Sequence, residues 1–578
     1  MGEPVQDLEQ WRRLALGVLR KSGLAGEDTP PEAVVDLLST ETYDGLRIAP
    51  LYSAEDPAQT PAPPAGLPGQ VPFVRGGSGA PRPWDVRQRH ADPDAKATRA
   101  AVLDDLENGA TSLWLAGIAP GDLAEVLDGV YLDLAAVVLD NGAETVEAAR
   151  AFLALPGDDK SGNLGADPLG WSARTGAAAD MSVLAALSKI SPVPVATVDA
   201  TVYHDAGAGD AEELGYATAT GVAYLRELVA AGLSAGMALK QLEFRFAATA
   251  DQFATIAKLR AARRIWSRVA QVCEVPHLGA QRQHAVTGDP MMTARDPWVN
   301  LLRTTVACFA AGVGGADAVT VQPFDARLGL PDGFSRRIAR NTQSLLIEES
   351  GVARVLDPAG GSWYTESLTD ALAHAAWDVF TEVERAGGMA AALRGGMVAD
   401  RIGATRQRRA EDVAHRRRPI TGVSEFPDLA ERRPVRAPAP PPPSGGLPRI
   451  WYSESFERLR DAADAAAEPP SVRLVALGSP AAHSARVSFA SNLFAAGGVR
   501  LFAGPADGPS PVACICGSDR SYAEEAADTA RRLKDEGVRT VWLAGKPAGY
   551  DGVDAYLYTG CDALAVLQQT HRDLGVAP

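Results

Sequence analysis

The chemistry that this sequence could perform depends first on three histidines. His483 follows the apolar run RLVAL at 473–477, His204 precedes Asp205, and His284 ends the triplet RQH. An imidazole can ligate a metal ion, donate a hydrogen bond to a carbonyl group or move a proton near neutral pH. Each role needs a second group that orients the ring, so the neighbours of each histidine decide which role is open to it.

The cysteines do not add a metal site to these histidines. The five are scattered without a C-x-x-C pair or a histidine at metal-ligand spacing: Cys273, Cys308, Cys514, Cys516 and Cys561. Two of them, Cys514 and Cys516, alternate along an apolar run, which favours packing in a core. The pattern is typical of a reducing compartment and predicts a cytoplasmic protein without a bound metal.

Composition excludes several classes of partner. The chain has 578 residues, a formal net charge of −16 and a sequence pI near 5.1, which argues against nucleic acid and anionic membranes. No apolar run approaches the ~18 residues needed to cross a bilayer. The first 23 residues lack the order of a signal peptide and predict an amphipathic helix instead.

Two Pro-rich stretches, at 53–69 and 433–448, divide the chain. We expect an N-terminal arm and linker at 1–69, a barrel domain at 70–420, a Pro-rich linker at 421–470 and a C-terminal domain at 471–578. A basic run at 400–418 predicts a solvated or domain-bridging helix.

The middle of the chain alternates strand-like runs with amphipathic helices. The runs are TSLWLAG at 111, AAVVLD at 135, VPVATVD at 193 and ADAVTVQ at 316. This rhythm and length predict a (β/α)8 TIM-type barrel of the α/β class. The helix predicted at 253–273 has an apolar side opposite basic residues, as an outer barrel helix would.

The C-terminal domain shows the same rhythm on a smaller scale. Five short apolar runs start at residues 473, 499, 512, 538 and 555. They predict a flavodoxin-like doubly wound parallel sheet, with any ligand at the carboxyl ends of the strands.

Several segments resemble the methylmalonyl-CoA mutase family. They are DGL and PLY at 44–52, PFVRG at 72–76, RPW at 82–84 with RQ at 87–88, AKLR at 257–260, TARDP at 293–297 and RPITGVSEF at 418–426. The most specific segment, FSRRIARNTQSLLIEESGVARVLDPAGGSWYTESLT at 334–369, is followed by GGM at 387–389. The resemblance covers most of the chain and implies the barrel followed by a cobalamin-binding-type domain.

The resemblance also shows which site residues are missing from the C-terminal domain. Catalytic members of the family carry D-x-H-x-x-G, in which the histidine ligates cobalt and the aspartate orients it. With His483 as the ligand, the Asp position is Ala481 and the Gly position is Arg486. Lys546 would project into the entrance for the nucleotide tail of cobalamin. The resemblance therefore implies a degenerate site in which His483 is a remote candidate for cobalt.

The barrel departs from the family pattern in the same way. The family's tyrosine after R-Q is Arg89, its arginine for the substrate carboxylate is Gln241, and its thioester histidine is Val202. His204 lies two residues further along the expected strand and could have inherited that role. Three positions match family substrate contacts and are expected to be vestigial: Arg82, Arg87 and His284.

These departures imply the small, non-catalytic subunit of a heterodimeric mutase that interconverts methylmalonyl-CoA and succinyl-CoA. We expect no catalytic residue on this chain, and we expect adenosylcobalamin to be bound by a large catalytic subunit that this chain supports. We further predict that side chains fill the barrel axis. Two alternatives stay open: a self-sufficient cobalamin-dependent acyl-CoA mutase with altered ligands, and a coenzyme A-sensing regulatory subunit.

Overall fold

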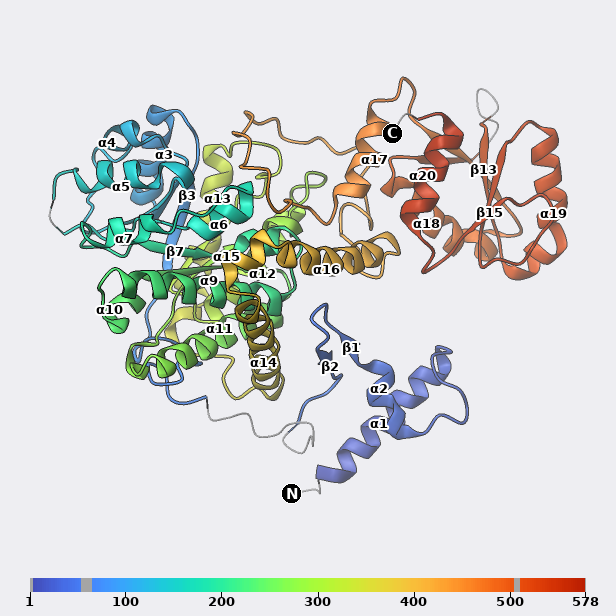
Figure 1. Cartoon of the computed structure of the whole chain (residues 1–578). Helices are drawn as coiled ribbons and strands as arrows, with labels where there is room; N and C mark the ends of the chain where they lie inside the picture. Colours follow the sequence, from blue (N-terminus) through green and yellow to red (C-terminus); the bar gives the residue numbers. More distant parts are fainter. Residues whose placement is uncertain (1–3, 54–64, 158, 504–509, 577–578) are drawn as a thin grey trace.

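The computed structural model describes residues 4–53, 65–157, 159–503 and 510–576 (Figure 1). Eight parallel strands form its central sheet, in the order β6-β5-β4-β3-β10-β9-β8-β7. A parallel bridge between Ala166 and Ala196 joins the two ends of this sheet into a barrel. The predicted (β/α)8 barrel is therefore confirmed.

The barrel strands are short and separated by helices. The strands are β3 (Asp85–His90), β4 (Ser112–Ala116), β5 (Ala136–Asp140), β6 (Gly162–Asn163), β7 (Ala196–Asp199), β8 (Leu242–Ala248), β9 (Arg282–Thr287) and β10 (Ala318–Thr320). The helices around them are α3 (Ala95–Glu107), α4 (Leu123–Val126), α5 (Thr145–Leu153), α6 (Pro168–Thr175), α7 (Ser182–Ser188), α8 (Thr201–Asp205), α9 (Asp210–Ala230), α10 (Ala235–Leu239), α11 (Gln252–Val272), α12 (Val299–Val313) and α13 (Gly333–Ser344). None of the described helices is both long and apolar enough to cross a membrane.

Alternate residues of each strand face the surrounding helices or the barrel axis. Phe244 and Phe246 of β8 face outward, where Phe244 packs against Trp266 of α11 with a centroid distance of 4.6 Å. Residues between them face the axis, and in β3, β8 and β9 many of these are charged. Outward packing therefore forms the apolar core, while the axis is polar.

Helix α11 differs from the expected outer helix. Its basic residues Lys258, Arg260 and Arg263 are buried, not solvated. Helix α14 (Trp363–Arg385) packs over α11 and α9 as an additional outer layer, where its Glu366 pairs with Arg260, whereas Arg263 donates to the carbonyl oxygens of Val74 and Gly314. Lys258 Nζ pairs with Glu213 at 2.7 Å, so burial of the charge is compensated.

The helices α15 (Met389–Arg394) and α16 (Met397–Ala414) complete the barrel domain. The basic residues of α16 bridge several parts of the chain, as the bridging interpretation predicted. Arg409 donates to the carbonyl oxygen of Gly207 at 2.8 Å, and Arg408 donates to the carbonyl oxygen of Tyr43 at 2.6 Å. Val413, in the last turn, belongs to the core of the C-terminal domain.

The N-terminal arm projects away from the barrel (Figure 1, blue). It contains α1 (Pro4–Lys21), α2 (Val34–Leu38), β1 (Thr40–Glu41) and β2 (Arg47–Ile48), and the predicted N-terminal helix is confirmed. Leu16, Leu19 and Val34 form a small core of their own. The arm therefore has its own local fold.

Asp44 attaches the arm to the barrel. Its carboxylate accepts hydrogen bonds from the backbone nitrogens of Asp210 and Ala211, at 3.0 and 3.1 Å, and so caps the N-terminus of α9. The capping position of α9 is Gly209, where a Cβ atom would lie 2.2 Å from the Asp44 carboxylate. Glycine is needed here because the carboxylate approaches the backbone directly.

The C-terminal domain has five parallel strands in the order β12-β11-β13-β14-β15. They are β11 (Ser471–Ala476), β12 (Arg500–Ala503), β13 (Val512–Cys516), β14 (Thr540–Ala544) and β15 (Ala555–Leu557), covered by α18 (Pro480–Ala496), α19 (Asp519–Asp535) and α20 (Ala563–Leu574). This is the predicted flavodoxin-like order. Cys514 and Cys516 are buried in its core, as expected.

The two Pro-rich stretches differ in how much of them the structure describes. Residues 54–64 of the first lie outside the described residues. The second, 433–448, contains neither helix nor strand, as expected. Within the expected linker 421–470, however, helix α17 (Glu454–Asp464) is ordered, because Phe456 packs into the core of the C-terminal domain.

Candidate functional site

The barrel axis contains a buried ion pair between strands far apart in sequence. Arg87 of β3 and Glu243 of β8 are both buried, and the Arg87 Nη1 to Glu243 Oε1 distance is 2.6 Å. Arg87 Nε also donates to Ser112 Oγ at 3.2 Å. Burial raises the pKa of the Glu243 carboxyl, but the guanidinium groups of Arg87, Arg282 and Arg245 together more than offset this and hold that pKa below its ordinary value. The pair is therefore charged.

A second buried arginine lies further along β8. Arg245 donates to Asp199 at 2.8 Å and to Asp140 at 3.2 Å, and it lies over the ring of Trp114 at 3.9 Å. Arg174 also pairs with Asp199. Guanidinium and carboxylate groups from β5, β7, β8 and α6 thus meet at one point on the axis.

His284 connects the two arginines. Arg245 Nε donates to His284 Nδ1 at 3.2 Å, and His284 Nε2 lies 2.8 Å from Thr320 Oγ1. The Thr320 hydroxyl donates onward to the carbonyl oxygen of Arg87. Burial, followed by the charges of Arg87 and Arg245, lowers the pKa of His284 well below its ordinary value. The ring is therefore a neutral structural link.

These side chains fill the barrel axis, as predicted. Arg87, Arg245 and His284 are at most 2% exposed, and all three project inward from strands. An acyl-CoA ester could not pass along the axis without displacing the ion pairs. The sequence had marked Arg87 and His284 as vestigial contacts, and the structure brings these two together.

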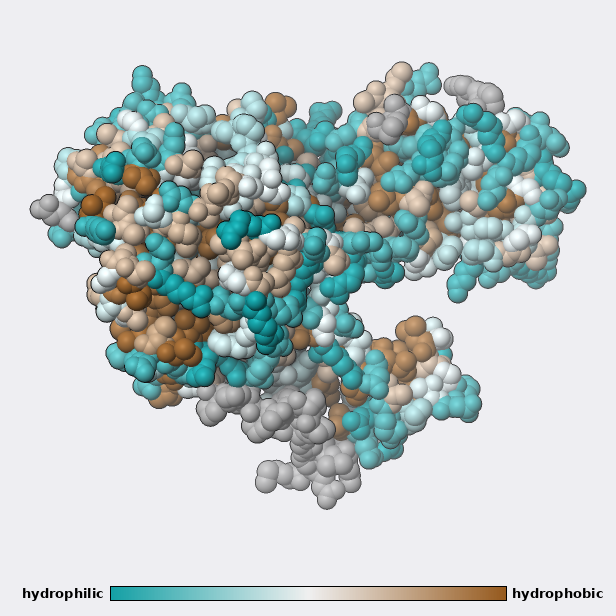
Figure 2. Space-filling model, in the orientation of Figure 1, coloured by the Kyte–Doolittle hydropathy of each residue, from teal (hydrophilic) through white to brown (hydrophobic). Residues whose placement is uncertain are grey.

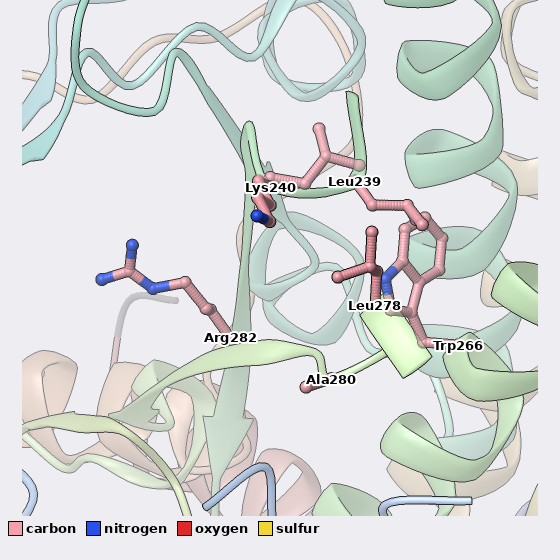
Figure 3. Close-up of a pocket in the computed structure, with 7 residues that line it drawn as sticks. Leu239, Lys240, Trp266, Leu278, Ala280 and Arg282 are labelled. Carbon is pink, nitrogen blue, oxygen red and sulfur yellow. The ribbon is translucent and has the colours of Figure 1, made fainter. Parts of the chain in front are cut away.

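A small recess lies at the amino-terminal ends of β8 and β9 (Figure 3). Its volume is about 260 Å³, and its lining includes Leu239, Trp266, Leu278 and Arg282. Figure 3 shows the three apolar side chains together and Arg282 directed away from them. The recess is smaller than most pockets that enclose a ligand of drug size. It does not continue into the axis, where Arg87 and Glu243 meet.

His204 does not occupy the expected strand. Strand β7 ends at Asp199, and His204 lies in the short helix α8. Its ring is buried, with Nδ1 3.6 Å from Glu213 Oε2. Burial lowers its pKa to about 3, with a smaller contribution from Lys258. The expected position of His204 on a continued strand is therefore wrong, because the chain turns into α8 after Asp199.

The other sequence-predicted positions are dispersed. Arg82 lies just before β3, is exposed and pairs with Asp317 at 2.7 Å. Gln241 lies just before β8, and its Oε1 is buried without a partner among the described residues. Arg89 lies over Trp114 at 5.0 Å from the ring centroid, and Val202 is buried.

In the C-terminal domain, the segment that corresponds to D-x-H-x-x-G follows the carboxyl end of β11 and is part of a helix. Ser479 precedes α18, Pro480 is its first residue and His483 lies in its first turn. His483 Nδ1 lies 3.4 Å from the carbonyl oxygen of Leu477. No carboxylate hydrogen-bonds to this ring among the described residues.

The side chains of Arg486 and Tyr522 lie at the carboxyl ends of the strands of this sheet. The Tyr522 hydroxyl donates to the carbonyl oxygen of Ala544 at 2.7 Å and accepts from the nitrogen of Gly517 at 2.8 Å, so it bridges β13 and β14. Arg486 lies 4.8 Å from the centre of the Tyr522 ring and pairs with Asp519.

The sequence predicted that Lys546 projects into the entrance at these strand ends, and this stays a prediction. Lys546 is exposed, whereas Tyr522 is buried and Arg486 is partly covered. The departure of Arg486 from the family glycine was visible in the sequence, but the role of Tyr522 depends on packing. Tyr522 hydrogen-bonds to Gly517 and Ala544, and Arg486 donates to the carbonyl oxygen of Gly517, so both side chains lie at the carboxyl ends of β13 and β14. The described residues contain no cluster of three metal-ligating side chains.

Neutral His284 predicts a specific pH dependence of stability. Its pKa is lower in the folded than in the unfolded protein, so its contribution is present above pH ~6.5 and lost as the pH falls. We expect the stability advantage of the wild type over His284→Leu to shrink by up to ~1.4 kcal/mol per pH unit between pH 6 and 5. Denaturant unfolding at pH 5 to 8 measures this, and parallel curves for the two proteins would contradict it.

The fold defines an α/β protein in which a (β/α)8 barrel is followed by a smaller doubly wound domain, and buried side chains occupy the barrel axis. The family model for methylmalonyl-CoA mutase matches residues 41–124 and 182–463, and the chain belongs to this family.

Among its relatives, a Streptomyces virginiae protein named methylmalonyl-CoA mutase small subunit is 55% identical over 98% of this chain and 97% of its own length. A Mycobacterium tuberculosis protein named probable methylmalonyl-CoA mutase small subunit is 45% identical over 93% of both chains. The small subunit of Propionibacterium freudenreichii subsp. shermanii is 39% identical over 98% of this chain and 95% of its own length.

Proposed function

We propose that this chain is the small subunit of a heterodimeric methylmalonyl-CoA mutase and acts as a non-catalytic scaffold for the large subunit. The observation that carries this proposal is that side chains fill both ligand positions. The barrel axis contains Arg87, Glu243 and Arg245. The carboxyl ends of the strands in the C-terminal sheet are covered by Arg486 and Tyr522. The near full-length match to relatives named as small subunits supports the same assignment.

In this proposal, adenosylcobalamin and the acyl-CoA substrate bind to the large subunit. That subunit would interconvert methylmalonyl-CoA and succinyl-CoA in the cytoplasm. The present chain would stabilise and orient the large subunit. Its own barrel would not have to open, because it would not admit substrate. The alternatives, a self-sufficient mutase and a coenzyme A sensor, both require cavities that the buried ion pairs and Tyr522 occupy.

The N-terminal arm supports the proposed assembly. Its outer surface carries hydrophobic side chains (Figure 2), among them Leu14, Val18 and Leu24, each about two-thirds exposed. Leu14 and Val18 are four residues apart and so share one face of α1. A locally folded element that projects away from its own barrel with an uncovered apolar face suits a contact with another subunit. We infer that the arm wraps the large subunit.

Cobalamin retention tests the proposal. The isolated chain is incubated with adenosylcobalamin, desalted and examined for corrin absorbance, and isomerase activity is then assayed with and without the large subunit. We expect less than one-tenth of an equivalent of corrin on this chain and activity only in the complex. The large subunit treated identically is the positive control. Stoichiometric corrin on the isolated chain would overturn the proposal.

A further inference from the structure

A short hairpin attaches the arm to the barrel. Strands β1 and β2 pair antiparallel, and the turn between them presents Tyr43 and Asp44. We call residues 40–48 the anchor hairpin. Among the described residues, no hydrogen bond or ion pair joins segment 4–38 directly to the barrel. Figure 1 shows β1 and β2 between the arm helices and the barrel, so the anchor hairpin is the joint between these two parts.

Asp44 supplies the capping group that helix α9 lacks. The residue before α9 is Gly209, which has no side chain to accept a hydrogen bond from the first turn. The Asp44 carboxylate accepts instead from the backbone nitrogens of Asp210 and Ala211, at 3.0 and 3.1 Å. Asp44 and Asp210 are 166 residues apart. The cap therefore connects two distant parts of the chain as well as ending a helix.

Tyr43 attaches the anchor hairpin to a second helix, α16. Its hydroxyl donates to Asp412 Oδ2 at 2.8 Å, and its carbonyl oxygen accepts from Arg408 Nη2 at 2.6 Å. The guanidinium of Arg409 lies 4.5 Å from the centre of the Tyr43 ring. Arg409 also donates to the carbonyl oxygen of Gly207, so α16 is itself fixed to the barrel. Adjacent residues of one turn are thus held by two different helices.

The anchor hairpin is also joined closely to the arm helices. Only Ser39 separates the end of α2 from the start of β1. Ser39 Oγ donates to the carbonyl oxygen of Val35 at 2.7 Å and accepts from Arg47 Nε at 3.0 Å. Helix α2 packs in turn on α1 through Val34. Contacts therefore continue from α9 and α16 to the helix that carries the exposed apolar face of the arm.

We propose that the anchor hairpin fixes the direction of the arm before the large subunit binds, and that Tyr43 and Asp44 are positioning residues for assembly. This inference rests on the proposed function, in which the arm contacts the large subunit. A segment that becomes ordered only on binding loses conformational entropy at that moment, whereas an ordered segment has already lost it. Loss of either residue therefore weakens the complex without either residue touching the large subunit.

Capping of α9 can be separated from positioning of the arm. The release variant, Tyr43→Ala with Asp44→Ala, removes the cap and both anchors. The recapped variant adds Gly209→Ser, which supplies a local cap, because the Asp44 oxygen that would lie 2.2 Å from the new Cβ atom is gone. The backbone at Gly209 is extended, with φ −75° and ψ 171°, as a capping serine requires. The recapped variant therefore regains the cap but not the anchors.

Double electron–electron resonance measures the direction of the arm in the free, full-length chain. One spin label is placed at Lys21→Cys on α1 and one at Arg385→Cys on α14, both exposed positions. The partly exposed Cys273 is replaced by serine, and the other cysteines are buried. We expect a narrow distance distribution with the native hairpin and a much broader one in both the release and the recapped variants.

The conservative change Asp44→Asn is expected to keep the distribution narrow. Burial and the neighbouring carboxylates of Asp210 and Glu212 raise the pKa of Asp44 to about 7, so a neutral group is tolerated at this position. The amide also keeps one of the two acceptor oxygens, and asparagine caps helices as well as aspartate does.

Binding to the purified, cobalamin-loaded large subunit is then measured by titration calorimetry. The release and recapped variants are both expected to bind about tenfold more weakly than the wild type. Thermal unfolding should show a loss of stability in the release variant that the recapped variant recovers. The matched control, Ser362→Ala, removes the cap of α14 and should bind like the wild type. Weakened binding by this control would mean that a lost cap alone explains the effect.

Two further outcomes overturn the inference and leave the proposed function intact. A narrow distance distribution in the recapped variant would show that Tyr43 and Asp44 do not fix the arm. Wild-type affinity in a variant with a broad distribution would show that the direction of the arm does not matter for assembly. Absence of binding by the wild-type chain would instead contradict the proposed function, and the inference with it.

Discussion

Glu243→Leu will destabilise the barrel by about 3–5 kcal/mol, because it leaves the buried Arg87 guanidinium with only the more distant carboxylate of Asp85, at 4.0 Å. The Nη1 to Oε1 distance of 2.6 Å and the burial of both side chains place this pair among those whose disruption is costly. Arg87→Met has a similar cost, since Glu243 then stays charged or takes up a proton in a dry environment. Denaturant unfolding followed by tryptophan fluorescence measures both changes.

The double variant Arg87→Met, Glu243→Leu is the informative comparison. Replacing a buried ion pair by apolar side chains of similar volume is often neutral or stabilising, so we expect recovery to within about 1–2 kcal/mol of the wild type. The matched control is the exposed pair Arg531–Asp528, where removal of one partner costs less than about 1 kcal/mol. Additive losses in the double variant would mean that the two residues are not energetically coupled.

Removal of residues 1–38 is expected to weaken binding to the large subunit by at least about 100-fold while barrel stability stays unchanged. Burial of each leucine or valine side chain contributes about 1.5–3 kcal/mol, and two such side chains account for a loss of this size. Barrel stability is unaffected because Leu16, Leu19 and Val34 pack with one another in the arm. The truncated chain keeps Asp44 and its cap on α9.

A full-length variant separates the apolar contact from chain length. Leu14→Ser with Val18→Ser changes only exposed positions on one face of α1, so the arm should stay folded. We expect it to reproduce most of the affinity loss. Binding at the wild-type level by both proteins would show that the arm has no role in assembly, whereas loss in the truncation alone would move the contact to other arm residues.

Apolar periodicity predicted four of the eight barrel strands and all five strands of the C-terminal sheet. The strands that it missed are informative. LEFRFAA alternates charged and apolar residues, which is the pattern of a half-solvated strand, and DVRQRH and RQHAVT are mostly polar. In the barrel, Arg87, Glu243 and Arg245 are buried at the axis instead of facing water, because partners from distant strands neutralise them.

The candidate site could be predicted to the extent that it depends on local replacements. The replacement of glycine by Arg486 and of aspartate by Ala481 is visible in the sequence. These replacements predicted that the cobalt-binding position of the C-terminal domain is degenerate. Tyr522 was not readable, because its position between β13 and β14 depends on how α19 packs. His204 was misplaced because β7 ends at Asp199 and the chain turns into α8.

The sequence alone therefore determined the family, the order of the elements and which family site residues are absent, since these follow from local patterns. Tertiary structure decided which side chains occupy the positions of the absent site residues. Arg87 and Glu243 are 156 residues apart, and a buried charge is tolerated only when an opposite charge meets it in space. No local pattern encodes that meeting, because it arises when the barrel closes and brings β3 and β8 to the same axis.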